Sequence, residues 1–143
     1  MAVGLVSCSG PEKVVTIRQY HLSSLDADTG GIPSIRGEKL KRLHGAVSLE
    51  EQRERLGHYY TLRWDGPEGR ESEPVRVVFR YRQAMSASKV LTIERRAPAG
   101  RKGLMEIQVT GPAYLEQGRV LSWHLSFYRG DELVATEQSY LWE

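Results

Sequence analysis

Strict alternation of apolar and polar side chains along residues 119–128 constrains the fold of this chain more than any other sequence feature. The apolar positions are Leu121, Trp123, Leu125 and Phe127. Side chains two residues apart on a strand point to the same face of a sheet, so this segment has one face for a core and one for solvent. The pattern therefore predicts a half-buried β-strand.

Six further segments carry a similar pattern and are separated by turn residues. They span residues 14–22, 58–64, 74–82, 89–96, 104–110 and 132–142. Seven short strands with turns between them, in a chain of 143 residues, are typical of a two-sheet antiparallel sandwich. We therefore predict an all-β, immunoglobulin-like sandwich, and a closed barrel is the alternative. The alternation places these residues in the core: Leu62, Val77, Phe79, Ile107, Trp123, Leu125 and Phe127.

One short surface helix is predicted over residues 48–57. Ser48 and Glu51 have the spacing of a capping box, in which a hydroxyl and a carboxylate each accept a hydrogen bond from a free backbone N–H. Arg53 and Arg55 suit the negative end of the helix dipole, and Gly57 can close the helix in a left-handed conformation.

Two other segments have no strand pattern and read as irregular. Glycine, proline and aspartate favour a long loop over residues 23–37, and a second loop is expected between Gly111–Pro112 and Gly118. Residues 35–47 are ambiguous. They carry a basic group formed by Arg36, Lys39, Lys41 and Arg42.

The single cysteine, Cys8, ends the N-terminal segment Leu5–Val6–Ser7–Cys8. This segment resembles the lipobox of bacterial lipoproteins, in which an aliphatic residue and two small or permissive residues precede a cysteine that is acylated. The resemblance implies that Cys8 is lipidated. It also implies an outer-membrane location facing the periplasm, because Ser9 is not the acidic residue that retains lipoproteins in the inner membrane.

The N-terminal segment departs from the lipoprotein pattern in two ways. No Lys or Arg precedes it, and its apolar stretch is limited to residues 1–6. A start upstream of Met1 would supply both parts, and a buried free thiol in an N-terminal strand is the alternative role for Cys8. We expect residues 1–12 to comprise a signal remnant, the lipobox and a polar tether, and residues 13–143 to form a single β-sandwich domain.

Charge and composition exclude several classes of protein. Lys and Arg number 20 against 18 Asp and Glu, an excess too small for a dedicated nucleic-acid binder. No apolar run approaches the roughly 20 residues that a membrane-spanning helix requires. The 40% apolar and 27% charged residues are close to globular averages, which excludes intrinsic disorder.

Arginines on predicted strands form the candidate binding surface. Arg76, Arg80 and Arg82 fall on one side of the strand at 74–82, and Arg63 is expected on a neighbouring strand of the same face. Guanidinium groups bind carboxylate and phosphate through pairs of parallel hydrogen bonds. The partner expected is therefore an envelope protein or an anionic envelope polymer, and not a nucleic acid. The alternative is a solvated face on which Glu94 and Glu106 pair with the arginines.

No catalytic, cofactor or metal site is predicted. The histidines are His21, His44, His58 and His124, and no two of them have the spacing of metal ligands. No serine lies in a Gly-x-Ser-x-Gly motif. Arg129–Gly130–Asp131 matches the tripeptide that integrins recognise, but Gly-Asp also favours a tight turn, and we expect a turn.

The expected function is that of a non-catalytic cell-envelope lipoprotein domain that binds a protein or an anionic polymer. The alternative is an envelope hydrolase that acts on a glycan or peptide through a site formed by strand-end loops. A cleft would favour the hydrolase if it gathered two or more of His44, His58, His124, Asp65, Glu94 and Glu106.

Overall fold

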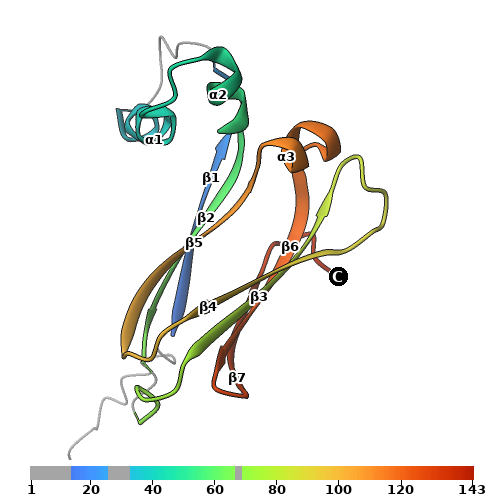
Figure 1. Ribbon diagram of the computed structural model, residues 1–143. Helices are drawn as coiled ribbons and strands as arrows, with labels where there is room; N and C mark the ends of the chain where they lie inside the picture. Colours follow the sequence, from blue (N-terminus) through green and yellow to red (C-terminus); the bar gives the residue numbers. More distant parts are fainter. Residues whose placement is uncertain (1–13, 26–32, 67–68) are drawn as a thin grey trace, which may run out of the picture.

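The computed structural model describes residues 14–25, 33–66 and 69–143. Within these ranges seven strands form two antiparallel sheets that pack face to face (Figure 1). The first sheet has the order β1-β2-β5 and contains β1 (Val15–Leu22), β2 (Gly57–Asp65) and β5 (Lys102–Thr110). The second has the order β4-β3-β6-β7 and contains β3 (Val75–Gln83), β4 (Leu91–Ala97), β6 (Val120–Arg129) and β7 (Glu132–Gln138).

This strand order is immunoglobulin-like. In the constant-type domain, strands A, B, E and D form one sheet, and strands C, F and G form the other. Here β1, β2 and β5 take the places of A, B and E, while β3, β6 and β7 take those of C, F and G. The fourth strand pairs with β3 and so belongs to the second sheet. The predicted sandwich is confirmed, and the barrel alternative is wrong.

The core lies between the two sheets. All seven residues predicted to be buried are buried: Leu62, Val77, Phe79, Ile107, Trp123, Leu125 and Phe127. The ring of Tyr60 lies 4.7 Å from that of Phe79 and 5.7 Å from that of Trp123, measured between centroids. The indole Nε1 of Trp123 donates to Oε1 of Gln19 at 3.2 Å, which joins the two sheets.

Three helices occur in the described part of the chain, all at one end of the sandwich (Figure 1). α1 (Pro33–Leu43) and α2 (Leu49–Glu54) belong to the β1–β2 connection, and α3 (Pro112–Gln117) connects β5 to β6. The helix predicted at 48–57 is confirmed as α2. Oγ of Ser48 accepts from the N–H of Glu51 at 3.1 Å, and the Glu51 carboxylate accepts from the N–H of Val47 at 3.0 Å.

The prediction of a single helix is wrong, because α1 and α3 occupy regions that read as loop or ambiguous. Gly37 is an unfavourable helix residue, yet it lies within α1, whose last turn carries basic side chains that suit the helix dipole. Gly111 and Gly118 flank α3 at φ values of 64° and 80°, and Pro112 takes the first helical position, where no backbone N–H is needed.

Gly57 has a different role from the predicted helix cap. It begins β2, and a Cβ atom there would lie 2.1 Å from the carbonyl oxygen of Val109. Close approach of β2 and β5 therefore requires glycine at this position.

A histidine pair closes the core at the end that carries the helices. His21 and His58 are partners across β1 and β2, and their rings stack with centroids 3.9 Å apart. Nε2 of His58 accepts from the N–H of Val120 at 3.0 Å, and Nε2 of His21 lies 2.8 Å from the hydroxyl of Tyr114 on α3. Burial, reinforced by His21 and Arg119, lowers the pKa of His58 to about 4, so this ring is neutral near pH 7.

A buried arginine closes the opposite end of the core. Arg129 is fully buried, and its guanidinium donates to the carbonyl oxygens of Gly66, Glu73 and Arg101 at 3.2–3.3 Å. The predicted turn is present between β6 and β7, with Gly130 at a φ of 57°. The Arg129–Gly130–Asp131 tripeptide therefore does not present an arginine to solvent.

Candidate functional site

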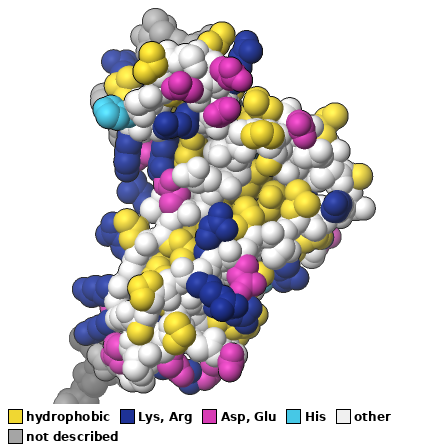
Figure 2. Space-filling model, in the orientation of Figure 1, with side chains coloured by type: hydrophobic (Ala, Val, Ile, Leu, Met, Phe, Trp, Pro, Cys, Tyr) yellow, Lys and Arg dark blue, Asp and Glu magenta, His cyan; other side chains and the backbone are white. Residues whose placement is uncertain are grey.

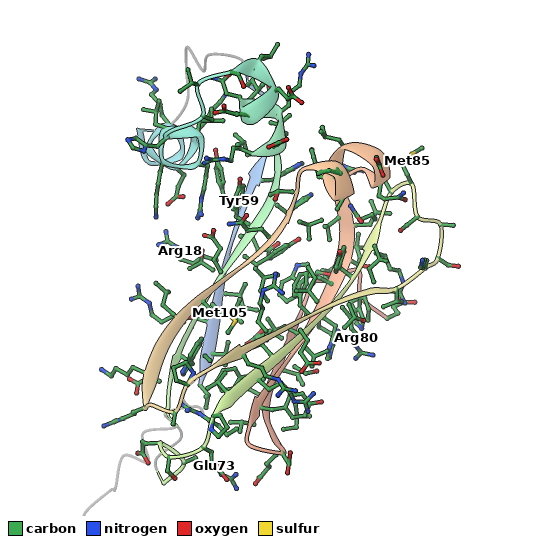
Figure 3. The ribbon with its side chains drawn as sticks, viewed as in Figure 1. Arg18, Tyr59, Glu73, Arg80, Met85 and Met105 are labelled. Carbon is green, nitrogen blue, oxygen red and sulfur yellow. The ribbon has the colours of Figure 1, made fainter. Side chains whose placement is uncertain are left out.

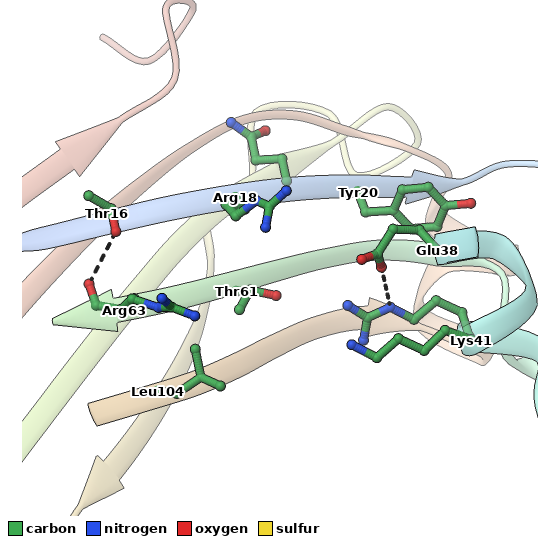
Figure 4. A pocket seen from close by; sticks show the side chains of 10 residues that line it. Thr16, Arg18, Tyr20, Glu38, Lys41, Thr61, Arg63 and Leu104 are labelled. Carbon is green, nitrogen blue, oxygen red and sulfur yellow. Dashed lines mark hydrogen bonds and ion pairs between the residues drawn. The ribbon is translucent and has the colours of Figure 1, made fainter. Parts of the chain in front are cut away.

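A groove of about 540 Å³ lies where α1 meets the outer face of the first sheet (Figure 4). The strands supply its floor and α1 supplies one wall. The lining residues on the strands are Thr16, Arg18, Gln19, Tyr20, Thr61, Arg63 and Leu104, and those on α1 are Glu38, Lys41 and Arg42. We refer to this feature as the cationic groove.

The register of β1 and β2 sets the floor of the cationic groove. Arg18 pairs with Thr61, and Thr16 pairs with Arg63. These positions alternate with core residues, so both arginines are on the outer face, and both are exposed. Figure 3 shows Arg18 directed away from the sheet. Oγ1 of Thr16 donates to the carbonyl oxygen of Arg63 at 3.5 Å.

Arg42 holds α1 against the sheet. Its guanidinium lies over the ring of Tyr59, 4.5 Å from the centroid, on the outer face of β2. Arg42 also forms ion pairs with Glu38 on the same helix, at 3.5 Å, and with Glu106 on β5. Arg55, just beyond α2, donates to the carbonyl oxygen of Arg42 at 3.0 Å. The charge of Arg42 is therefore compensated locally, and its role is structural.

Three other cations line the groove, and the Glu38 carboxylate that shares it is paired with Arg42 and not with them. No ion pair joins Arg18, Lys41 or Arg63 to an acidic side chain in residues 14–25, 33–66 and 69–143. Figure 2 shows basic side chains gathered along the left margin of the molecule, below α1. Two guanidinium forks and an ammonium group beside threonine hydroxyls form a donor set for a carboxylate or phosphate group.

The arginine face predicted from the sequence is divided between the two sheets. Arg63 lies on β2 in the first sheet, whereas Arg76, Arg80 and Arg82 lie on β3 in the second. The prediction of one shared face is therefore wrong. β2 and β3 are consecutive in the chain but belong to different sheets, so their outer faces point in opposite directions.

The two glutamates expected to pair with those arginines have other partners. Glu94 pairs with Arg96 at 3.2 Å, and Glu106 pairs with Arg42. Arg76, Arg80 and Arg82 form no ion pair with an acidic side chain in the described ranges.

The six residues considered for a hydrolase do not line the cationic groove. Asp65 pairs with Arg101 at 3.3 Å and with Lys102 at 3.6 Å. His58 stacks on His21, and His124 lies on the outer face of β6 beside Arg80. In the part of the chain that the structure describes, no group of three or more His, Cys, Asp or Glu could hold a metal ion.

Arg18 and Glu38 were not singled out by sequence analysis, and Lys41 and Arg42 could not be placed. The available signals were the polar position of Arg18 on a predicted strand and the basic group at residues 36–42. Neither signal locates the groove, because its assembly depends on α1 and on pairing across the long β1–β2 connection.

Comparisons with known proteins give no family. No protein-family model matches the sequence, and no curated protein is significantly similar to it. The structure is similar to the crystal structure of an immunoglobulin-like protein from Pseudomonas aeruginosa, with 19% identity and a TM-score of 0.39 over 58% of this chain and 70% of that one.

The predicted lipobox at Leu5–Cys8 and the domain boundary at residue 13 lie outside the described residues. Among the described helices, none is both long and apolar enough to cross a membrane.

Proposed function

We propose that this protein is a non-catalytic, immunoglobulin-like binding domain of the bacterial cell envelope that holds an acidic ligand in the cationic groove. The observation that carries the proposal is the set of Arg18, Lys41 and Arg63, which line one groove with no paired carboxylate. The volume of about 540 Å³ is within the range of ligand sites, roughly 300–1,000 Å³.

The lining chemistry favours binding over hydrolysis. Glycoside hydrolysis needs two carboxylates on opposite sides of the bond that is cleaved. The carboxylate that lines this groove belongs to Glu38 and is paired with Arg42. Among the described residues, the groove therefore offers no second carboxylate for such a reaction.

Binding of two short acidic probes tests the proposal: the galacturonate trimer, which carries carboxylates, and tripolyphosphate. Isothermal titration calorimetry at low salt should show that the parent protein binds at least one of them. Hydrogen bonds to charged groups contribute about 1.5–3 kcal/mol each, so R18Q/R63Q should weaken that binding at least tenfold. Raising the salt concentration should weaken it as well, because exposed charges are screened.

A matched variant removes the same charge elsewhere. R53Q/R95Q replaces two exposed arginines outside the groove and should bind like the parent. The proposal fails if R18Q/R63Q binds as tightly as R53Q/R95Q, or if the parent binds neither probe.

The envelope location rests on the lipobox-like segment Leu5–Cys8, and we propose that diacylation of Cys8 anchors the domain to the outer membrane, facing the periplasm. The test is to express the gene with its upstream region in a bacterial host and to measure the mass of the membrane-associated protein. We expect a lipid adduct that C8S abolishes. An unmodified thiol at Cys8 would contradict this proposal and leave the groove proposal intact.

A further inference from the structure

The outer face of the second sheet carries a second group of arginines, held by aromatic rings. On β3, Arg76, Arg80 and Arg82 pair with Tyr128, His124 and Ser122 of β6, respectively. All three arginines alternate with core residues, so they share the outer face. We call this surface, formed by Arg76, Arg80, Arg82, His124, Tyr128 and Trp142, the arginine–aromatic face; Arg80 is labelled in Figure 3.

The C-terminal segment brings Trp142 onto this face. Ser139 is fixed to β6 by three hydrogen bonds to Trp123. Its N–H donates to the carbonyl oxygen of Trp123 and its Oγ accepts from the N–H of Trp123, both at 2.9 Å, and its hydroxyl donates to the same carbonyl oxygen at 3.3 Å. The N–H of Trp142 then donates to the carbonyl oxygen of Ser139 at 3.1 Å, which closes a turn. The indole ring lies 4.3 Å from Cζ of Arg82 and 5.6 Å from Cζ of Arg80.

Ring contacts leave the arginine charges uncompensated. Cζ of Arg76 lies 4.1 Å from the ring centroid of Tyr128. Nη2 of Arg80 lies 3.3 Å from Nδ1 of His124, and burial together with Arg80 lowers the pKa of His124, so the imidazole is neutral and can accept. A ring beneath a guanidinium orders it but leaves N–H groups at its edge free to bind an oxyanion.

Exposed hydroxyl and amide groups flank the arginines. One row across the second sheet contains, in order, Thr92 of β4, Arg80 of β3, His124 of β6 and Gln138 of β7, each paired with the next. The next row of the same face runs from Glu94 of β4 through Val78 and Ser126 to Thr136 of β7, and the Glu94 carboxylate is paired with Arg96 at 3.2 Å. Thr92, Thr136 and Gln138 are all exposed.

From these contacts we propose that the arginine–aromatic face binds an extended acidic polysaccharide, independently of the cationic groove. Positions on a strand rise by about 3.4 Å per residue, so the arginines present charges roughly 7 and 14 Å apart along a flat line. Flanking hydroxyl and amide groups match the hydroxyls of a sugar chain. Single-stranded nucleic acid fits less well, because it stacks its bases on bare aromatic rings, and here Tyr128 and Trp142 are covered by guanidinium groups.

The probe is a galacturonate decamer, which carries one carboxylate per sugar, and its affinity is measured by calorimetry for the parent, R80Q/R82Q and R18Q/R63Q. We expect R80Q/R82Q to bind the decamer at least tenfold more weakly than the parent, while retaining parental affinity for the short probe that occupies the groove. W142A should also weaken decamer binding, because it removes the ring that orders both guanidinium groups. Thermal unfolding checks that each variant is folded.

R53Q/R95Q serves again as the matched control and should retain the parental affinity for the decamer. The inference is overturned if R80Q/R82Q binds the decamer like this control, or if an oligothymidylate of equal charge binds the parent more tightly than the decamer does. Failure of the groove proposal appears separately, as unchanged binding of the short probe by R18Q/R63Q.

Discussion

The two ends of the sandwich core are both closed by polar side chains, but they depend on opposite protonation states. Arg129 closes one end as a charged donor to three carbonyl oxygens. His58 closes the other end as a neutral acceptor, because its Nε2 accepts a hydrogen bond from the N–H of Val120. Arginine stays protonated at all relevant pH values, whereas histidine titrates. The comparison shows that a polar group at the end of a core is stable when its partners match its protonation state, and that the histidine end loses this match when the ring is protonated.

The largest effect is expected for R129M. Methionine fills much of the same space but leaves the carbonyl oxygens of Gly66 and Glu73 without this donor, whereas that of Arg101 still accepts from the N–H of Gly66 at 2.9 Å. Each buried group left unpaired costs about 1–3 kcal/mol, so we expect a loss of roughly 3–5 kcal/mol in the free energy of unfolding. Urea denaturation at pH 7 measures it. R53M, on the exposed surface of α2, is the control and should change stability by less than about 0.5 kcal/mol. A loss below about 1 kcal/mol for R129M would mean that the donors are dispensable.

An intermediate effect is expected on acidification. The pKa of His58 is about 4 in the folded protein and 6.5 in the unfolded chain, so the unfolded state binds the proton more readily. Stability should therefore be complete above pH 6.5 and fall as the pH decreases towards 4. Solvent reaches part of the ring, so we expect a loss of about 1–3 kcal/mol. Protonation removes the acceptor for Val120 and places a charge against His21, 3.9 Å away between ring centroids.

The variant H58Q separates the effect of His58 protonation on stability from the effect of protonating carboxylates, which occurs at lower pH. Its amide oxygen can accept from Val120 without titrating. Denaturation midpoints measured between pH 7 and 5 should fall less for H58Q than for the parent. Parallel curves for the two proteins would contradict the assignment to His58.

The smallest effect is expected for Y114F, which removes the hydroxyl 2.8 Å from Nε2 of His21 and keeps the ring that packs on both histidines. A single hydrogen bond contributes about 0.5–1.5 kcal/mol, and His21 is exposed enough for water to replace the hydroxyl. Thermal unfolding should show a correspondingly small decrease in Tm. A loss of stability as large as that of R129M would contradict this ranking of the expected effects.

The sandwich could be predicted because the alternation of apolar and polar residues shows which side chains of a strand face the core, and this can be read for each strand separately. Phe127 and Trp123 are buried as expected. Arg129 follows positions 123, 125 and 127, whose side chains face the core, at the same two-residue spacing. The alternation alone therefore predicts that Arg129 is buried. The residue type pointed the other way, because arginine is seldom buried without partners. Its partners are carbonyl oxygens contributed by loops distant in sequence.

The cationic groove could not be predicted, because no local pattern encodes it. Arg18 and Lys41 line the same groove because α1 packs over the first sheet. Few apolar residues indicate where this helix packs, and Leu40 is 66% exposed. The split of the arginine face has the same origin. The sequence shows which residues of a strand share a face. It does not show to which sheet the strand belongs, because that depends on pairing between distant segments.

The long β1–β2 connection also bears on the order in which the protein folds. β6 and β7 are joined by Gly130–Asp131 alone, so they can pair early. β1 can pair with β2 only after residues 23–56 have brought their ends together, at an entropic cost that grows with loop length, and such non-local pairing slows folding. We therefore expect β1, and Arg18 with it, to dock late. The groove then forms in a final step, and a ligand bound there would slow unfolding without speeding the early stages of folding.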